Sequence, residues 1–154
     1  MLEKIGIVAL LNLLPTAEQI GGITVGLSLG LNPVTVFFVS LLVNCLLFFP
    51  VYFGLKIFYD RFLSRIKLFK KYIERTRKKG KPYIDKYGIL GLTLFIAIPT
   101  PLTGTYTASI LSWFLGLDWK RSFIAIATGS TIGAIIIFLG YFGVFYTSRA
   151  VLGV

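Results

Sequence analysis

The stretch "FIAIPTPLTGTYTAS", residues 95–109, lies near the centre of an uncharged segment that covers residues 87–117. Pro99 and Pro101 each remove a backbone N–H donor and disfavour a helical conformation in the residue before, so the pair predicts a break in a helix. Inside lipid, a broken helix leaves backbone groups unpaired at a cost of several kcal/mol each unless protein or water supplies partners. The stretch therefore predicts a helix that stops at membrane depth, beside protein or a water-filled cavity.

The composition is that of an integral membrane protein, with a single membrane domain over residues 1–154. Of the 154 residues, 56% are hydrophobic and 14% are charged, and the mean hydropathy is +0.83, which is more apolar than a soluble domain of average composition. The chain has one cysteine, Cys45, and no histidine, which excludes a disulfide framework and the usual general base and metal ligand. We therefore predict no enzyme, no cofactor and no metal site.

The hydrophobic pattern predicts two spanning helices and two helical hairpins. Residues 33–55 and residues 122–148 carry no charge, and each segment exceeds the about 20 residues that a spanning helix needs. Four shorter apolar segments flank Pro15 or the proline pair, at residues 5–14, 20–31, 87–98 and 102–117. At about 1.5 Å per residue each reaches only roughly 15 to 24 Å into a bilayer core of about 30 Å. A helix that enters, breaks and returns fits these lengths, and one kinked crossing in each place is the alternative.

The chain repeats itself with an offset of 86 residues. Residues 15–38 lie over residues 101–124, and each copy is a broken hairpin followed by a long span, in residues 1–55 and 87–154. Because a hairpin crosses the membrane zero times and a span crosses once, the second copy starts on the opposite side. The predicted fold is an all-α inverted-topology repeat of re-entrant hairpins, which places substrate sites at the repeat interface near the membrane midplane.

A basic connector joins the two copies. Residues 56–86 contain twelve Lys and Arg side chains against three acids, a net charge of +9 out of +10 for the chain. The positive-inside rule places this block in the cytoplasm, and the topology then places Lys120 and Arg121 at the cytoplasmic edge and both termini outside. We predict a multi-pass protein of the cell membrane whose connector attracts anionic lipid, with no nucleic acid as a partner.

The connector has the pattern of an amphipathic helix. Apolar side chains recur at helical spacing among the basic residues, at Phe58, Phe62, Ile66, Phe69 and Ile73. We predict that this helix continues the first span along the interface and that Gly80 and Pro82 end it.

Glu18 is the only acid between Lys4 and Asp60, and it lies just past the break at Pro15. One interpretation is local: Thr16 and Gln19 fit a capping box, and an acid in the first helical turn suits the helix dipole. The other is functional, because an acid at membrane depth costs about 2.5 to 3.5 kcal/mol and such carboxylates usually mark ion or proton paths.

Polar residues follow the second break, at Thr103, Gly104, Thr105 and Thr107. At the start of the second half-helix they would present free N–H groups and hydroxyls to the membrane midplane, which suits a phosphate or a carboxylate. The same hydroxyls would also satisfy backbone donors that the prolines disturb, and the two roles are compatible. Asn44, in the middle of the first span, must find a polar partner in lipid, so it either binds substrate or bridges helices.

Small residues recur at a spacing of four, at Gly22, Gly26 and Gly30 and again at Gly129 and Gly133. Such spacing lets helix backbones approach closely, either within the chain or at a seam between two copies. A chain with so few membrane segments can surround only part of a transport path, so we expect a homodimer.

Two motifs resemble those of the small multidrug export protein family, short prokaryotic membrane proteins related to the DedA-type, VTT-domain superfamily. The first family motif reads roughly L-P-x-x-E-x-R-G-x-I-P, and "LPTAEQIGGIT" keeps Pro15, Glu18, Gly21 and Ile23. It has Ile20 where the family prefers Arg and Thr24 where the family prefers Pro.

The second family motif, I-P-x-P-x-T-G, is matched in full by Ile98, Pro99, Pro101, Thr103 and Gly104. Asn44, with Pro50 farther on, approximates a third element of the family, G-N-x-x-P. The resemblance implies paired re-entrant hairpins, with Gly21 among the packing residues. The wider superfamily implies movement of lipids such as polyprenyl phosphates, often coupled to protons.

These observations predict a small proton-coupled transporter for a lipid-phosphate or another amphipathic molecule. Glu18 would take and release the proton, while the half-helix that starts after Gly104 would meet the substrate. Because Ile20 replaces the family Arg, a phosphate would depend on helix N-termini, with Lys120 or Arg121 only at the edge, whereas a cationic drug would use Glu18 as counter-ion. The alternative is a membrane scaffold or interaction protein that acts through its basic connector and transports nothing.

Overall fold

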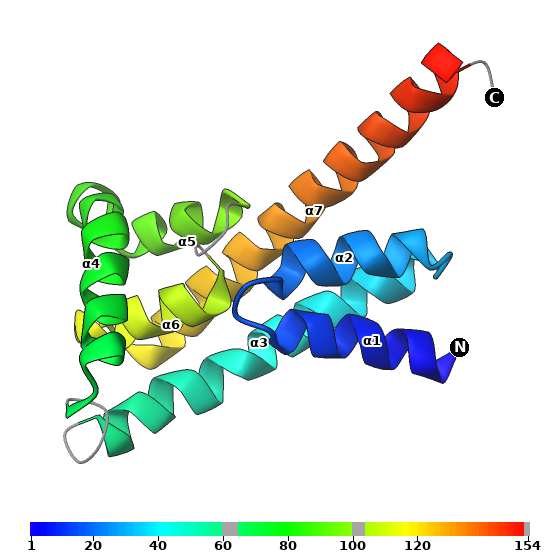
Figure 1. Cartoon of the computed structure of the whole chain (residues 1–154). Coiled ribbons are helices and arrows are strands. Elements are labelled where there is room, and N and C mark those ends of the chain that lie inside the picture. Colours follow the sequence, from blue (N-terminus) through cyan, green and yellow to red (C-terminus); the bar gives the residue numbers. More distant parts are fainter. Residues whose placement is uncertain (60–64, 100–103, 153–154) are drawn as a thin grey trace.

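The computed structural model describes residues 1–59, 65–99 and 104–152 and is drawn in Figure 1. Every regular element in these ranges is an α-helix, which confirms the predicted all-α class. The helices are α1 (Leu2–Leu13), α2 (Glu18–Ser28), α3 (Pro33–Phe58), α4 (Lys67–Tyr87), α5 (Ile89–Ala97), α6 (Thr105–Phe114) and α7 (Trp119–Leu152).

Two helices, α3 and α7, are long and apolar enough to cross a membrane, and they contain the two predicted spans. Only 28% of the most apolar window of α3 and 33% of that of α7 is buried inside the chain. Large apolar side chains instead face outward, among them Phe38, Leu42, Leu46 and Leu139. Apolar surface on this scale requires lipid or a protein partner to cover it.

The breaks fall where the prolines predict them. Helix α1 ends at Leu13, just before Pro15, and α5 ends at Ala97, just before Pro99. In each pair the second helix runs back beside the first, and the starts of α2 and α6 meet near the centre of the molecule (Figure 1). In the described residues each pair of short helices is therefore antiparallel. Pro101 and Thr103 lie outside the described residues.

The two halves of the chain share their order of elements and their corners. In each half a hairpin of short helices precedes the long helix, and the corner between them holds a glycine with positive φ, Gly30 at 73° and Gly116 at 65°. Both corners make the same pair of backbone hydrogen bonds. In the bond of the pair that spans more residues, the N–H of Leu31 donates to Gly26 O in the first corner, and the N–H of Leu117 donates to Ser112 O in the second. This is the Schellman geometry, which needs a residue that tolerates the left-handed region. Two similar local sequences therefore fold the same way 86 residues apart.

Helix α4 corrects two predictions. It runs through Gly80 and Pro82 without stopping and ends at Tyr87, where Gly88 caps it with a φ of 61°. It also does not continue α3, because it lies across the ends of α5 and α6 (Figure 1). The contacts that hold it explain both results: Gly80 faces Leu111 of α6 so closely that a Cβ would overlap it, and Ile73 is buried against the same helix. This packing outweighs the helix penalties of about 1 kcal/mol for Gly and about 3 kcal/mol for Pro.

The core lies between the two halves of the chain. Its largest cluster joins α3, α5, α6 and α7 through Phe48, Tyr52, Leu92, Phe95, Ile96, Ala108, Leu111, Ala125 and Ile126. A smaller cluster joins α2, α3 and α7 through Ile23, Leu27, Val36 and Ala134. Between these two apolar clusters the hairpin turns meet in a polar region.

Candidate functional site at the meeting point of the two hairpins

Glu18 lies at the first hairpin turn and reaches the second. Its side chain is 7% exposed, and its Oε2 accepts a hydrogen bond of 2.9 Å from the backbone N–H of Thr105, the first residue of α6. The capping-box interpretation is wrong, because Ala17 is the N-cap of α2 and no side chain caps that helix. The carboxylate leaves its own helix and caps the helix of the other hairpin instead.

The local geometry is built around this contact. Glu18 has a φ of 40°, a left-handed conformation that costs a non-glycine residue about 1–3 kcal/mol and that often marks a functional position. Opposite it lies Gly104, the N-cap of α6, where a Cβ would overlap the Glu18 carboxylate. The approach of the two turns therefore depends on an acid at one position and a glycine at the other.

A buried chain of hydrogen bonds continues from Thr105 into the first half of the molecule. Thr105 Oγ1 donates to Asn44 Oδ1 at 2.9 Å, Asn44 Nδ2 donates to Asn12 Oδ1 at 2.8 Å, and Asn12 Nδ2 donates to Ser40 Oγ at 3.1 Å. None of these four side chains is more than 1% exposed. The chain of bonds thus links α6, α3 and α1 behind the Glu18 contact.

The structure brings together Glu18, Asn44, Gly104 and Thr105 among the predicted site residues. Thr107 is buried on α6, and Thr103 lies outside the described residues. Asn12 was missed by the sequence reasoning, although a lone Asn in the apolar run "VALLNLL" is the same kind of signal as Asn44. Polar residues in apolar helices must find partners, and here the partners are one another.

A small cavity of about 40 Å³ lies beside the Glu18 contact. A polar cavity of this size is large enough to hold water. Three of the atoms on its lining residues have no hydrogen-bond partner in the described part of the chain: Glu18 Oε1, Gln19 Nε2 and Ser130 Oγ. A molecule bound in the cavity could therefore pair with one acceptor, one donor and one hydroxyl group.

Equivalent positions of the two repeats line the cavity. With the offset of 86, Glu18 corresponds to Gly104, Gln19 corresponds to Thr105, and Asn44 corresponds to Ser130. The site therefore forms where the two halves of the chain face each other.

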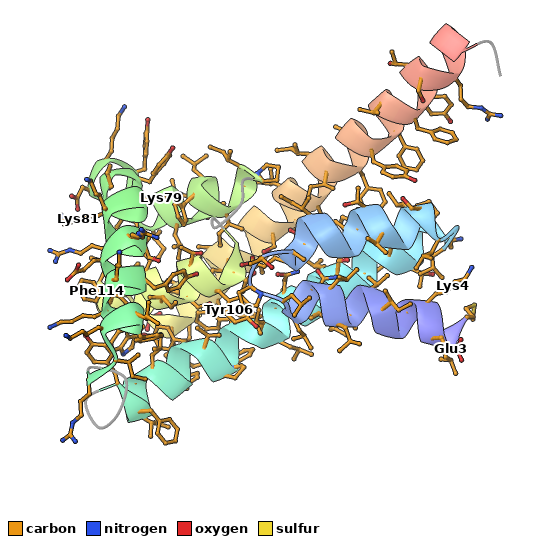
Figure 2. All side chains as sticks on the ribbon, in the orientation of Figure 1. Glu3, Lys4, Lys79, Lys81, Tyr106 and Phe114 are labelled. Atoms are coloured by element: carbon orange, nitrogen blue, oxygen red, sulfur yellow. The ribbon has the colours of Figure 1, made fainter. Side chains whose placement is uncertain are left out.

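Two apolar grooves border this polar cavity. One, of about 760 Å³, lies between α3, α4 and α6 and shares Pro15 with the cavity. The other, of about 530 Å³, lies between α2 and α7 and shares Ile20, Pro99 and Ile137 with it. Tyr106 lines the first groove, and its hydroxyl donates to Leu13 O at 2.6 Å; Figure 2 shows it at the centre, beside the turn between α1 and α2.

The family model described as "Putative small multi-drug export protein" matches residues 18–136. The chain belongs to this family. The match begins at Glu18 itself and includes Asn44, Gly104, Thr105 and Ser130. No curated protein and no solved structure matches the chain. Membership of the small multi-drug export family and the two long apolar helices indicate a membrane protein of the transporter type.

Five of the predicted glycines of this small multi-drug export family member approach residues of their own chain, whereas no described residue lies within 4 Å of a Cβ on Gly30. A Cβ on Gly26 would lie 2.8 Å from Val8 of α1, and one on Gly129 would lie 2.7 Å from Thr93 O of α5. The others face the following neighbours: Gly22 faces Asn12, Gly21 faces Ala17, and Gly133 faces Ile96 and Gln19. These contacts are intramolecular, as the packing interpretation expects.

Lys120 and Arg121 lie exposed at the start of α7. In Figure 1 this end of α7 is on the same side of the molecule as α4. Among the described residues, no group of three or more His, Cys, Asp or Glu side chains is placed to hold a metal ion.

Replacing Asn44 by Leu is expected to destabilise the protein, because it leaves two buried groups, Thr105 Oγ1 and Asn12 Oδ1, without their partners. Each such loss costs about 1–3 kcal/mol. Thermal unfolding in detergent measures the effect, and Cys45→Ala on the same helix is the control, with a smaller loss. In a cycle with Asn12→Leu, the double variant should lose less than the sum of the two single losses; simple additivity would contradict the bonded pair.

Proposed function

We propose that this protein is a proton-coupled transporter that moves an amphipathic molecule of the lipid-phosphate class across the membrane. One observation carries the proposal: Glu18 is the only buried charged side chain among the described residues, and it lies at the meeting point of two hairpins, between two apolar grooves. A buried acid in a membrane protein usually serves an ion or proton path. Grooves on both sides would accept the apolar chain of a substrate whose head group enters the polar cavity.

In this proposal, α3 and α7 span the membrane and both hairpins are re-entrant, so that the two halves form an inverted repeat. The distribution of charge supports the orientation. Basic side chains cover α4, with Lys79 and Lys81 projecting from it in Figure 2, whereas both chain termini lie at the opposite end of the molecule. The α4 end would be cytoplasmic and the termini would be outside.

The amphipathic character of α4 fits a helix at the membrane surface. Its buried residues, Ile73, Thr76 and Gly80, face the core, while its basic side chains are exposed. Arg77 also lies 5.2 Å from the ring centroid of Phe114, a cation–π distance that fixes α4 against α6. We propose that this helix rests on anionic head groups, close to the mouth of the larger groove, which Phe69 and Tyr72 of α4 line.

The proposal assigns the transported class from two features together. The family description supports export of small molecules, and the DedA-type superfamily, to which we relate this family, supports lipid phosphates. A homodimer is part of the proposal: the C-terminal part of α7 extends beyond the rest of the chain (Figure 1) and exposes Leu139, Val144 and Tyr146, which a second copy would help to cover.

The proposal is tested in proteoliposomes that carry an imposed pH gradient. Two probes are compared, a fluorescently labelled polyprenyl phosphate and a cationic dye. We expect wild-type protein to move the phosphate faster than protein-free vesicles do, and to do so only when the gradient is present. Dye efflux without lipid movement would replace the lipid-phosphate substrate with a cationic drug.

The alternative, a scaffold that acts through its basic connector, is tested with the same vesicles. If the protein is such a scaffold, wild-type protein moves neither probe across the vesicle membrane. Reversing the charge of Lys78, Lys79 and Lys81 would in that case abolish the biological effect of the protein. On our proposal these reversals weaken attachment of α4 to anionic vesicles and leave the pH-driven step in place.

A further inference from the structure

Glu18 occupies the position that an anion would take at the start of α6. We propose that Glu18 is an internal competitor for that position: while ionised it holds the N-terminus of α6, and on taking up a proton it releases the N-terminus to an anionic head group. The inference rests on the proposed function and adds the order of events, with proton and anion entering together. It also names the charge of the substrate, since the head group that replaces a carboxylate is a phosphate or another oxyanion.

The first support is the contact itself. The N-terminus of a helix attracts anions through its free N–H groups and its dipole. Helix α6 is ten residues long, and the N–H of its first residue, Thr105, already donates to a carboxylate oxygen at 2.9 Å. The protein thus demonstrates with its own side chain that this position accepts an anionic oxygen.

The second support is independent of the helix end. Ser130 on α7 is 1% exposed, lines the same cavity, and its Oγ has no hydrogen-bond partner among the described residues. Gln19 Nε2 lines the cavity in the same unpaired state. Buried polar groups are normally paired, and these two donors share the cavity with one unpaired acceptor, Glu18 Oε1. Protonation of Glu18 would turn that carboxyl into a third donor, so the set suits a ligand with several acceptor oxygens.

The third support is the charge around the site. The described elements around Glu18 line the cavity with uncharged side chains: Gln19 from α2, Asn44 from α3, Ile96 from α5, Thr105 from α6 and Ser130 from α7. The titratable neighbour is Tyr106, whose hydroxyl donates to Leu13 O. No Lys or Arg is among the described residues that line the cavity, and residues 100–103 contain no titratable side chain.

This arrangement makes the two anions exclusive of each other. With no cation to compensate, a second anion beside an ionised Glu18 would meet a like charge in a site of low dielectric. A protonated Glu18 removes that charge, competes for the Thr105 N–H only as a neutral acceptor, which is weaker than a carboxylate, and becomes a hydrogen-bond donor to the incoming oxyanion. Binding of the anion and uptake of one proton are therefore coupled, and the coupling is reciprocal.

The test measures binding to protein in nanodiscs of zwitterionic lipid, by calorimetry between pH 5 and 9. The main probe is lysophosphatidylglycerol, a single-chain phosphodiester whose charge is constant over this range. We expect its affinity for wild type to fall about tenfold per pH unit at the alkaline end, because one proton is linked to binding. Repeating the titration in buffers of different ionisation enthalpy should show uptake of one proton per ligand bound.

Two variants isolate the residues involved. Glu18→Gln should bind the phosphodiester at every pH, with no proton uptake and no pH slope, because a neutral amide competes for the Thr105 N–H more weakly than a carboxylate does and does not titrate. Ser130→Ala should weaken binding at low pH without changing the slope. Ser122→Ala is its matched control, since Ser122 is another buried hydroxyl of α7 without a partner in the described residues and is not among the residues that line the cavity. Thermal unfolding verifies that each variant is folded.

Two further ligands test which part of the lipid is recognised and which charge the site prefers. Inorganic phosphate tests whether the head group alone suffices, and dodecyltrimethylammonium tests the opposite charge. A wild-type affinity for the phosphodiester that does not depend on pH, or an ammonium affinity that rises with pH while the phosphodiester does not bind, would overturn the inference. If lipid phosphate still moves in vesicles in that case, the proposed function stands and the competition fails; if nothing moves either, both fail.

Discussion

Glu18→Gln is expected to abolish the part of labelled lipid-phosphate movement that depends on the pH gradient. The substitution keeps the size of the side chain and an oxygen that can accept from the Thr105 N–H, but it removes the proton that the gradient drives. Because the wild-type carboxylate has no cationic partner in the described site, its loss removes a buried charge, which costs about 2.5–3.5 kcal/mol at membrane depth. The variant should therefore unfold at the same temperature as wild type or higher.

The measurement compares wild type, Glu18→Gln and Glu3→Gln in the same vesicles with and without the gradient. Glu3 is the matched control, because it is an acid near the exposed start of α1 (Figure 2) and its replacement should leave the rate unchanged. A slow, gradient-independent exchange is allowed in Glu18→Gln, since that variant still binds the anion. Wild-type rates that respond to the gradient in Glu18→Gln would refute the assignment of the proton to this residue.

The elements of the fold were accessible from local sequence. Pro15 and Pro99 predict where α1 and α5 end, because proline acts on its own turn and on the residue before it. Uncharged runs of sufficient length predict α3 and α7. In both cases the cause lies within a few residues of the effect.

Contacts between distant segments were not accessible in this way. Gly80 and Pro82 stay inside α4 because Leu111 and its neighbours hold that helix from outside, and no local rule contains this information. Glu18 reads locally as part of a capping box, yet its partner is Thr105, 87 residues away. Asn12 was overlooked for the same reason, since its partners Asn44 and Ser40 belong to another helix.

The close approach of Glu18 and Gly104 explains why the site has one acid and not two. With the offset of 86, Glu18 and Gly104 are equivalent positions, and the structure places them directly opposite each other, so that a Cβ on Gly104 would overlap the Glu18 carboxylate. Two turns related in this way leave room for one long side chain. The first repeat supplies it, and the second supplies the space and the helix N-terminus that binds it.

Gly104→Ala is accordingly expected to slow transport roughly 5- to 150-fold while leaving the helices intact. The new methyl group occupies the place of the carboxylate, so Glu18 must leave the Thr105 N–H; an unpaired buried group costs about 1–3 kcal/mol, which corresponds to a loss of roughly 5- to 150-fold in a step that needs the contact. The φ of −81° at Gly104 suits alanine, so the effect is steric rather than conformational. Gly6→Ala on α1 is the control, because nothing lies within 4 Å of its added Cβ.

Exchanging the two residues separates the position of the carboxylate from its mere presence. In the double variant Glu18→Gly with Gly104→Glu, the acid moves to the other repeat, and glycine takes the position with a φ of 40°, which it tolerates better than glutamate does. If the site requires one carboxylate between two equivalent turns, the exchange should transport faster than Gly104→Ala, as measured in the same vesicles with the same gradient. If Glu18 serves only to cap α6 from its own hairpin, the exchange should be as slow as Gly104→Ala, because Thr105 then has no acid facing it from α2.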